Sequence, residues 1–383
     1  MAEIRDTWTM GNNIVIRRVD SGADFKAFLK LPWRVYKNDR NWVPPIESDI
    51  RNRLDKKKNP FFEHADRELF LAHRDGEVVG RIVAILDENH NAFHEEKIVF
   101  FGLYESIDDP EVARALLDAA ASWGRERGMT ALRGPVNLSL NEECAFLLEG
   151  FDSPPVIMMP YNPPYYLKLM EDCGLAKAMD LYAYAITRDV KLPPKVEEIL
   201  REIRKKSSIT VRAVNMKDLK GEAEKFKYVY NNAWEKNWGF VLWTEKEMDH
   251  MVQNLKALAD PNIILLAEDR GRPVGFGFGL PNYNEVLIKL NGKLTPWNMA
   301  RILLGRRKIR SMRAPVFGIL KEYRMSGLSY LLFDEIVRRG KARGYEWCEM
   351  SWMLENNDAI NRFSLSVGAK VYKKYRIYQK SIA

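Results

Sequence analysis

The chain has 383 residues, of which 46% are hydrophobic and 29% charged, a composition typical of folded globular proteins rather than of disordered ones. No apolar run approaches the roughly 20 residues that cross a bilayer. The first residues also lack the hydrophobic core of a signal peptide, so we expect a cytoplasmic protein. Residues 1–190 carry 24 Lys and Arg against 31 Asp and Glu, whereas residues 191–383 carry 36 against 21. The basic second half indicates either an anionic ligand or partner, or a solvated basic face.

Two parts of the chain repeat the same residues at the same spacing. LAHRDGEVVG, at residues 71–80, shares its Leu-Ala, central Gly and Val-Gly with LAEDRGRPVG, at residues 266–275, an offset of 195. Asp118, Gly124, Arg127 and Gly128 recur at an offset of 216, so the second copy holds 21 additional residues in between. The repeat predicts two copies of one domain. The predicted ranges are 1–190 and 209–383, joined by a charged linker helix at 191–208.

The predicted elements follow the same order in both copies. Each copy begins with a short strand and helical segments, and a hairpin follows, with its turn at Asp75-Gly76 or Arg270-Gly271. A further strand leads to an amphipathic helix, at about 110–127 in the first copy and 327–343 in the second. A strand, a short helix and a closing strand complete the copy. The order β-α-α-β-β-β-α-β-α-β predicts an α/β fold with a mixed sheet.

The additional residues of the second copy fall within 285–313. From Lys289 to Arg313 this segment has eight Lys and Arg and no acidic residue. Such a segment is compatible with a lid, a dock for an acidic carrier protein, a contact to tRNA or a helix on a membrane surface. An additional helix with its polar face in water is the simplest interpretation.

The segment GILKEYRMSGLSYLLFDEIVRRG, at residues 318–340, predicts a site for a pyrophosphate. A strand ends near Leu320, a short polar turn follows, and a helix starts near Gly327. Free backbone N–H groups and the helix dipole favour an anion at such a helix start. Gly327 allows a close approach to the backbone, while Arg324 and Ser326 add a charge and a hydroxyl group.

This segment resembles the acyl-CoA signature of the GNAT acetyltransferase superfamily, [Q/R]-x-x-G-x-[G/A]. Arg324-x-x-Gly327-x-Ser329 has that spacing, and Asn357 lies eleven residues before Gly368, as in the family's penultimate helix. The resemblance covers about 209–382 and more weakly 14–187, so the chain is similar to bacterial tandem GNAT proteins. It implies acetyl-CoA or another acyl-CoA as co-substrate and no metal. The residues that it implies for acyl-CoA binding are Ile319, Leu320, Arg324, Met325, Ser326, Gly327, Leu328, Ser329 and Asn357.

The resemblance also implies where the acyl transfer takes place. In the family, the thioester lies between two splayed strands, here expected around 316–320 and 347–352, and a base accepts the proton of the attacking amine. Glu349 and Glu322 are the candidate bases. Strand alternation places Glu349 on one face of its strand and Cys348, Met350 and Trp352 on the other face. A carboxylate on the surface is the alternative for each candidate.

Three positions depart from the family pattern. Ser329 stands where the signature has Gly or Ala, and Met325 stands where many members have a glycine. Ser364 stands where the family often has a Tyr that protonates the leaving thiolate. Tyr375 or Tyr378, in the closing strand, is the candidate replacement for that general acid, and packing in the core or on the surface is the alternative.

The first copy differs at the matching turn. Asp108, Asp109 and Glu111 crowd the start of its helix, where they would cap the helix and repel a pyrophosphate. We therefore interpret the first copy as a degenerate GNAT-like domain that shapes the substrate cleft or stabilises the second copy.

Metal chemistry has little support in the sequence. His90 and His94 are four residues apart, but they fall in a polar segment, DENHNAFHEEK, that we expect to be a turn rather than a helix.

Three functions are compatible with these observations. The first is an acyl-CoA-dependent N-acyltransferase acting on an amine of a small molecule or a protein. The second is a tRNA-dependent aminoacyl or peptidyl transferase of the tandem-GNAT type, with RNA at the basic segment 289–313. The third is a non-catalytic acyl-CoA-binding protein.

Overall fold

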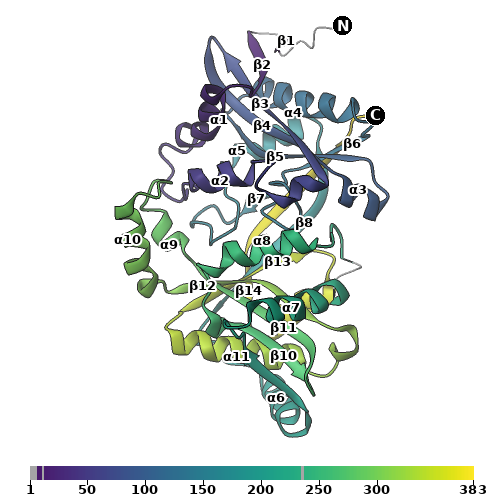
Figure 1. Cartoon of the computed structure of the whole chain (residues 1–383), viewed down its shortest axis with the longest axis vertical. Helices are drawn as coiled ribbons and strands as arrows, with labels where there is room; N and C mark the ends of the chain where they lie inside the picture. Colours follow the sequence, from purple (N-terminus) through teal and green to yellow (C-terminus); the bar gives the residue numbers. More distant parts are fainter. Residues whose placement is uncertain (1–6, 11–12, 234–236) are drawn as a thin grey trace. The chain divides into compact units, whose positions relative to one another are not determined.

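The computed structural model describes residues 7–10, 13–233 and 237–383 (Figure 1). The chain forms two compact units. The first unit contains the residues up to Asp180 together with 290–294 and 375–383. The second contains 181–289 and 295–374. These units differ from the predicted ranges because each takes up a segment from the far side of the predicted boundary.

The first unit has the predicted order of elements, with four short additional ones: strands β1 and β7, helix α3 and the 3-10 helix η1. Its elements are β1 (Thr7–Met10), β2 (Ile14–Arg18), α1 (Gly22–Val35), α2 (Glu47–Arg53), η1 (Pro60–Glu63), β3 (Ala65–Arg74), β4 (Glu77–Asp87), α3 (Glu88–His94), β5 (Ile98–Ser106), α4 (Pro110–Arg125), β6 (Ala131–Gly134), β7 (Phe146–Glu149) and α5 (Tyr165–Asp172). Strand β8 (Ala176–Thr187) starts in the first unit and ends in the second.

The second unit repeats this order and adds helices in the predicted insertion. Its elements are α6 (Pro194–Lys206), β9 (Ile209–Ala213), α7 (Leu219–Ala233), α8 (Glu245–Lys256), η2 (Pro261–Ile263), β10 (Ile264–Asp269), β11 (Arg272–Pro281), α9 (Asn284–Leu287), α10 (Pro296–Gly305), η3 (Arg306–Lys308), β12 (Ser311–Ile319), η4 (Lys321–Tyr323), α11 (Leu328–Arg343), β13 (Trp347–Leu354) and α12 (Asp358–Ser366). Strand β14 (Lys370–Ser381) starts in the second unit and ends in the first.

The predicted mixed sheet is confirmed in both units. The strand order is β1-β2-β3-β4-β5-β6-β14 in the first unit and β8-β13-β12-β11-β10-β9 in the second. Among the strand pairs of the described residues, β5–β6 and β12–β13 run parallel. The parallel pair takes the same place in each copy, with helix α4 or α11 as the crossover between its two strands.

The two copies exchange their last strands. Strand β8 follows β6 and α5 in the first copy, yet it pairs antiparallel with β13, from Thr187 opposite Trp347 onward. Strand β14 follows β13 and α12 in the second copy, yet its C-terminal half pairs with β6, with Tyr378 opposite Gly134. Tyr378 and Ile382 accordingly belong to the core of the first unit.

Two glycines of the repeat allow tight turns. Gly76 and Gly271 both have φ of +84°, and the residues before them, Asp75 and Arg270, also have positive φ. Two successive residues with positive φ are typical of the two-residue turns whose twist matches that of a hairpin. The predicted hairpins are therefore confirmed at both places.

Two other repeated glycines allow a helix to approach the sheet. A Cβ atom on Gly80 would lie 2.6 Å from Leu116 of α4. A Cβ atom on Gly275, the matching residue, would lie 3.2 Å from Leu328 of α11. The repeated Val-Gly pair thus reflects close packing of the crossover helix rather than a binding function.

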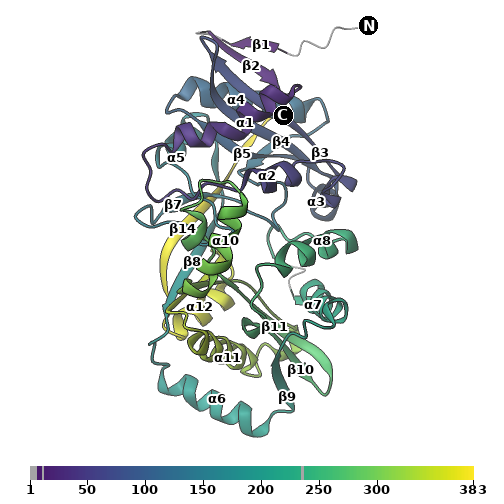
Figure 2. The same cartoon turned by 60° about the vertical axis from the view of Figure 1, so that its left-hand side comes forward.

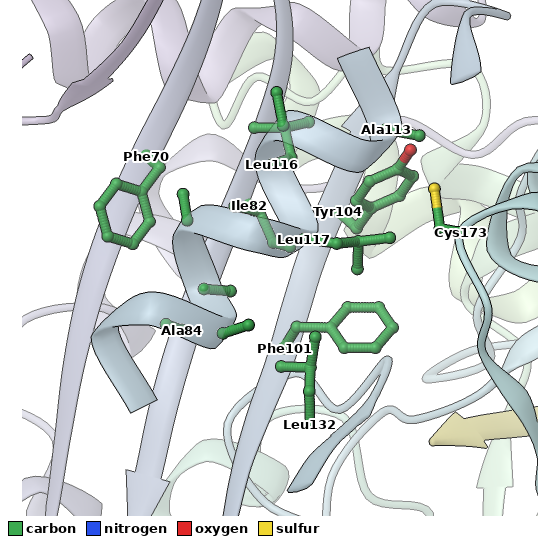
Figure 3. Close-up of a cluster of buried hydrophobic side chains, with 14 of the residues drawn as sticks. Phe70, Ile82, Ala84, Phe101, Tyr104, Ala113, Leu116, Leu117, Leu132 and Cys173 are labelled. Carbon is green, nitrogen blue, oxygen red and sulfur yellow. The ribbon is translucent and has the colours of Figure 1, made fainter. Parts of the chain in front are cut away.

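The core of the first unit lies under helix α4. Figure 3 shows Leu116 and Leu117 of this helix among Phe70, Ile82 and Phe101 of strands β3, β4 and β5. All five side chains are at most 1% exposed. Burial of a side chain of this size stabilises a fold by about 1.5–3 kcal/mol. The first copy has therefore kept a full hydrophobic core.

Helices cover both faces of the second unit's sheet (Figure 2). Phe226 of α7 packs on Phe276 of β11, with ring centroids 4.2 Å apart. On the opposite face, a Cβ atom on Gly277 would lie 2.5 Å from Ile336 of α11. Within the described ranges, no helix is both long and apolar enough to cross a membrane.

Candidate active site

The parallel strands β12 and β13 of the second unit separate before they end. Their pairing runs from Ser311 opposite Trp347 to Ala314 opposite Met350, whereas β12 continues to Ile319 and β13 to Leu354. Residues 314–317 of β12 and 352–354 of β13 are half-buried. The strands therefore splay after Ala314 and Met350, and their diverging ends present apolar side chains. The range expected on β12, 316–320, lies in the splay, whereas residues 347–350 of the range expected on β13 are still paired.

The equivalent strands of the first unit stay together. Beyond the last paired residues of β5 and β6, the Val136 N–H donates to the Phe101 carbonyl at 2.7 Å. The Leu103 N–H donates to the Asn137 side-chain oxygen at 2.8 Å. A Cβ atom on Gly102 would lie only 2.0 Å from the Val136 carbonyl oxygen. These two segments of the first unit are therefore hydrogen-bonded and closely packed beyond the paired residues.

The turn after β12 carries the residues of the predicted acyl-CoA loop. Ile319 ends the strand, and the buried Leu320 donates its N–H to the Val274 carbonyl at 3.0 Å. Gly327 has φ of +84° and precedes the first residue of α11, Leu328. The predicted strand–turn–helix arrangement is confirmed.

Several backbone donors of this loop are unpaired. Within the described part of the chain, the N–H groups of Met325, Gly327 and Ser329 make no hydrogen bond. The Leu328 N–H donates to the Ser326 hydroxyl oxygen at 3.3 Å. The Met325 side chain is 97% exposed, so the loop surface is open to solvent. Unpaired donors at a helix start fit the phosphate groups of a nucleotide.

Two residues of the loop make contacts within the second unit that the sequence does not indicate. The Arg324 guanidinium donates to the Ala233 carbonyl at 2.6 Å and so ties the loop to the end of α7. A Cβ atom on Gly327 would lie 2.9 Å from Ile199 of helix α6. The space beside Gly327 is therefore filled by a side chain of this chain. The predicted linker helix is part of the second unit and packs on α11 next to the loop.

Glu349 belongs to a buried polar cluster at the base of the splay. It lies opposite Arg313, whose Nε is 3.9 Å from Glu349 Oε1. Ser351 donates to Glu349 Oε1 and accepts a 3.0 Å hydrogen bond from Arg313 Nε. The Tyr372 hydroxyl donates to Glu349 Oε2. Arg313, Glu349 and Ser351 are at most 2% exposed, so the alternative that Glu349 is a surface carboxylate is wrong.

The environment of Glu349 opposes its ionisation. Burial raises the pKa of Glu349 above its ordinary value of 4.5, and this is the largest effect on the group. The Arg313 charge and the hydrogen bonds from Ser351 and Tyr372 act in the opposite direction. A carboxyl group with a raised pKa, joined by a hydrogen bond to a half-buried tyrosine, is suited to accepting a proton.

The alternation predicted for β13 is correct only for its first residues. Cys348 and Met350 pack in the core cluster under α11, on the face opposite Glu349. The pairing of β13 with β8 shifts between Met350 and Met353. Trp352 consequently lies against the Arg313 guanidinium, 4.9 Å from the ring centroid, instead of with Cys348 and Met350.

The other predicted acid–base residues lie elsewhere. Glu322 is about half exposed and accepts a 2.9 Å hydrogen bond from Arg272. It follows the C-terminal end of β12, whereas Glu349 lies opposite Arg313 near the start of that strand. Tyr375 is fully buried in the first unit's share of β14. Ser364 is also fully buried and donates to the Ile360 carbonyl at 2.9 Å. The structure therefore brings neither Glu322 nor Tyr375 to Glu349.

Asn357 and Asn361 organise the start of α12. Asn357 is the N-cap residue and accepts from the Ile360 N–H at 3.4 Å. Asn361 donates to the Leu354 carbonyl at 2.9 Å and accepts from the Tyr184 hydroxyl at 3.1 Å. Asn361 thereby holds the splayed end of β13. Sequence reasoning missed Asn361 and Tyr372, and no spacing signal marks either residue.

His90 and His94 lie on a helix, α3, so the expectation of a turn is wrong. His90 is 1% exposed, and its Nε2 lies 3.0 Å from a Glu96 carboxylate oxygen. Burial lowers the pKa of His90 to about 4. Across the described residues, no cluster of three or more His, Cys, Asp or Glu side chains is placed to hold a metal ion.

Comparison with known proteins places the chain in a family. No model of a protein family matches the sequence. Protein YghO of Escherichia coli is 37% identical over 387 aligned residues, which span 98% of each chain. A bacterial ceramide synthase of Caulobacter vibrioides is 35% identical over 373 residues, 95% of this chain and 96% of the relative.

The solved structures agree with the fold described above. A tandem GNAT protein from the clavulanic acid biosynthesis pathway superposes with a TM-score of 0.56. The superposition covers 97% of this chain and 99% of that protein at 11% identity, so it concerns the fold alone. The chain therefore belongs to the family of YghO and the Caulobacter ceramide synthase, and its fold is that of a tandem GNAT protein.

Proposed function

We propose that the chain is an acyl-CoA-dependent N-acyltransferase whose substrates bind to the second unit. The observation that carries the proposal is the set of unpaired N–H groups of Met325, Gly327 and Ser329, at the start of α11. These donors and the helix dipole fit the pyrophosphate of acyl-CoA. Acyl-CoA, as a substrate, would supply the thioester whose carbonyl carbon the acceptor amine attacks.

The splay of β12 and β13 supports a place for the reacting end of this substrate. The loop follows directly on β12, so a chain bound by its phosphates can run back between the diverging strands. Pro315, Val316 and Phe317 on one side and Trp352 and Met353 on the other are half-buried and apolar. These side chains would exclude water from a thioester and a hydrocarbon chain.

The cluster around Glu349 supports the proton transfer. In the proposed reaction the amine nitrogen forms a bond to the carbonyl carbon, the C–S bond breaks, and its electron pair leaves with the sulfur. The amine loses one proton to the Tyr372 hydroxyl, which passes its own proton to Glu349. Glu349 acts as the general base, and the proton then returns to the thiolate or to solvent. In this role Tyr372 replaces the predicted Tyr375.

The relative in Caulobacter suggests the class of acceptor. A ceramide is an amide between a fatty acyl group and the amine of a long-chain amino alcohol. We propose that this chain forms an amide of the same class, from a long-chain acyl-CoA and a long-chain amine. The family relationship supports this substrate class, and the apolar residues of the splay are compatible with it.

The proposed role of the loop in acyl-CoA binding can be tested by introducing the acidic residue that the first copy carries at the matching helix position. Ser329 is the second residue of α11, and Glu111 is the second residue of α4. Ser329→Glu places a carboxylate where the pyrophosphate would bind, while a carboxylate in the first turn also favours the helix. We expect calorimetry to show that Ser329→Glu weakens acyl-CoA binding about 100-fold, about 2.7 kcal/mol. Ser329→Ala, the matched control, should bind as the wild type does.

Activity is measured with hexadecanoyl-CoA and a long-chain amino alcohol, by following the release of free CoA thiol and the amide product by mass spectrometry. Amide formation that Ser329→Glu abolishes supports the proposal. Binding of acyl-CoA without transfer to any amine would instead identify a non-catalytic acyl-CoA-binding protein. Absence of acyl-CoA binding by the wild type would refute the proposal.

A further inference from the structure

Helix α10 of the second unit exposes most of its apolar side chains. Trp297 is 69% exposed, Met299 45%, Leu303 56% and Leu304 74%. Among the described residues, eleven large hydrophobic side chains are exposed, and four of them lie on this ten-residue helix. No residue of α10 is buried. An apolar cluster of this density on a surface marks a binding face.

The helix is well formed and has a defined inner side. The Thr295 hydroxyl caps its start by accepting from the Asn298 N–H at 3.2 Å, and Pro296 occupies the first helical position. A Cβ atom on Gly305 would lie 2.9 Å from Val286, because α10 packs on α9 there (Figure 1). The packing against α9 uses Gly305, so the four exposed apolar side chains remain available.

Basic residues adjoin this apolar face. Arg301, Arg306, Arg307 and Lys308 are exposed, and the sequence from Lys289 to Arg313 contains no acidic residue. The Arg301 guanidinium lies 5.9 Å from the centroid of the Trp297 ring. The neighbouring acid on α9, Glu285, accepts hydrogen bonds from the backbone N–H groups of Arg310 and Ser311. The face therefore combines a Trp–Leu surface with uncompensated positive charge.

We propose that α10 docks on the surface of a lipid bilayer that contains anionic lipids. Indole and leucine side chains enter the boundary between head groups and acyl chains, while arginine and lysine bind anionic head groups. A second copy of the chain fits less well, because a symmetric contact would bring the same basic residues together. The inference rests on α10 alone and does not require the proposed function. If both hold, the enzyme lies at the surface where long-chain substrates gather.

The experiment is sedimentation of the full chain with phosphatidylcholine vesicles, with and without about one third phosphatidylglycerol. We expect binding to the anionic vesicles that weakens as salt is added. Arg306→Gln/Arg307→Gln should weaken binding about 30-fold, since each basic residue near the surface contributes about 1 kcal/mol. Trp297→Ser should weaken it at least tenfold. The matched controls, Lys217→Gln/Lys220→Gln and Leu365→Ser, change exposed residues of the same kinds elsewhere and should bind normally.

Three results would overturn the inference. The first is failure of the wild type to bind anionic vesicles. The second is equal binding by the wild type and both α10 variants, which would place the lipid contact elsewhere. The third is self-association or binding to an acidic carrier protein that Trp297→Ser abolishes while vesicle binding is absent, which would identify a protein interface. Should Trp297→Ser fail to fold, the double Arg variant still decides the question. Acyl-CoA binding, measured in parallel, reports the proposed function separately.

Discussion

The two units start their crossover helices in opposite ways. In the first unit, the Asp109 side chain accepts from the N–H groups of Glu111 and Val112, and Arg74 donates to the same carboxylate. In the second unit, Gly327 stands at the cap position and provides no side chain. Among the described residues, the N–H groups of Met325, Gly327 and Ser329 have no hydrogen-bond acceptor. One helix start is satisfied internally and the other remains available to a ligand. The same fold thus yields a structural element in one copy and a candidate binding element in the other.

The strands beside these helices differ in the same sense. In the first unit, the segment after β6 is hydrogen-bonded to β5, and residues 98–102 are all buried. In the second unit, β12 and β13 part after Ala314 and Met350, and residues 314–317 are half-buried. Both differences favour the second unit as the catalytic one. Two copies of one fold can therefore differ at a helix start and at a strand pair, while the first copy keeps an intact core.

The largest expected effect is on kcat, and it should differ between one glutamate of the second unit and the matching glutamate of the first. Each unit places a Glu beside an Arg and a Tyr: the half-buried Glu105 with Arg81 and Tyr166, and the buried Glu349 with Arg313 and Tyr372. Glu349→Gln removes the proposed base, and we expect kcat to fall about 1000-fold with unchanged acyl-CoA affinity. Steady-state kinetics and calorimetry measure both quantities. Glu105→Gln is the matched control and should retain kcat, and a comparable loss in both variants would show that the effect is structural.

An intermediate effect, on the free energy of unfolding, is expected from a substitution that forces β5 and the segment after β6 apart. Gly102→Ala places a Cβ atom against the Val136 carbonyl oxygen. Overpacking of this kind costs about 1–3 kcal/mol of unfolding free energy. Urea unfolding followed by fluorescence measures the change. Gly22→Ala, where an added Cβ meets no atom within 4 Å, is the control and should not destabilise. Equal stability of both variants would mean that these strands separate at little cost.

The smallest expected effect is a shift in the pH dependence of activity. The proposed base acts when ionised, so activity is lost as the pH falls through the pKa of Glu349. Tyr372→Phe removes the proposed proton relay, so it should lower kcat as well. The hydrogen bond from Tyr372 also lowers the pKa of Glu349, so the acidic limb of the remaining activity should move to higher pH. We expect a shift of about one pH unit or less. Tyr375→Phe should leave the limb in place. The reverse pattern would return the acid–base role to Tyr375.

Much of the fold could be predicted from the sequence because each repeated residue meets a local structural requirement. Gly76 and Gly271 are needed for positive φ, and Gly80 and Gly275 for close packing of a helix. Such requirements depend on nearby residues, so their spacing reveals the element order. The turn from β12 into α11 could be predicted for the same reason.

The partner of each closing strand could not be predicted. β8 and β14 have similar patterns, and either would fit beside β6 or β13, so nothing local indicates the exchange. Tyr372 was missed for this reason, because its contact with Glu349 depends on where β14 runs. The contact between Ile199 and Gly327 is also long-range: the helix α6 was predicted, but its docking site was not.

The exchange of closing strands has a consequence for synthesis. In many multidomain proteins, the N-terminal domain folds while the rest of the chain is still being made. Here β6 gains its neighbour β14 only after residues 375–381 have been translated, so an edge of the first sheet stays unpaired until then. Ribosome-bound chains that stop before residue 375 should therefore bind chaperones and be cut by proteases within the first unit. On this prediction, the first unit completes its sheet only when the second copy has been translated as well.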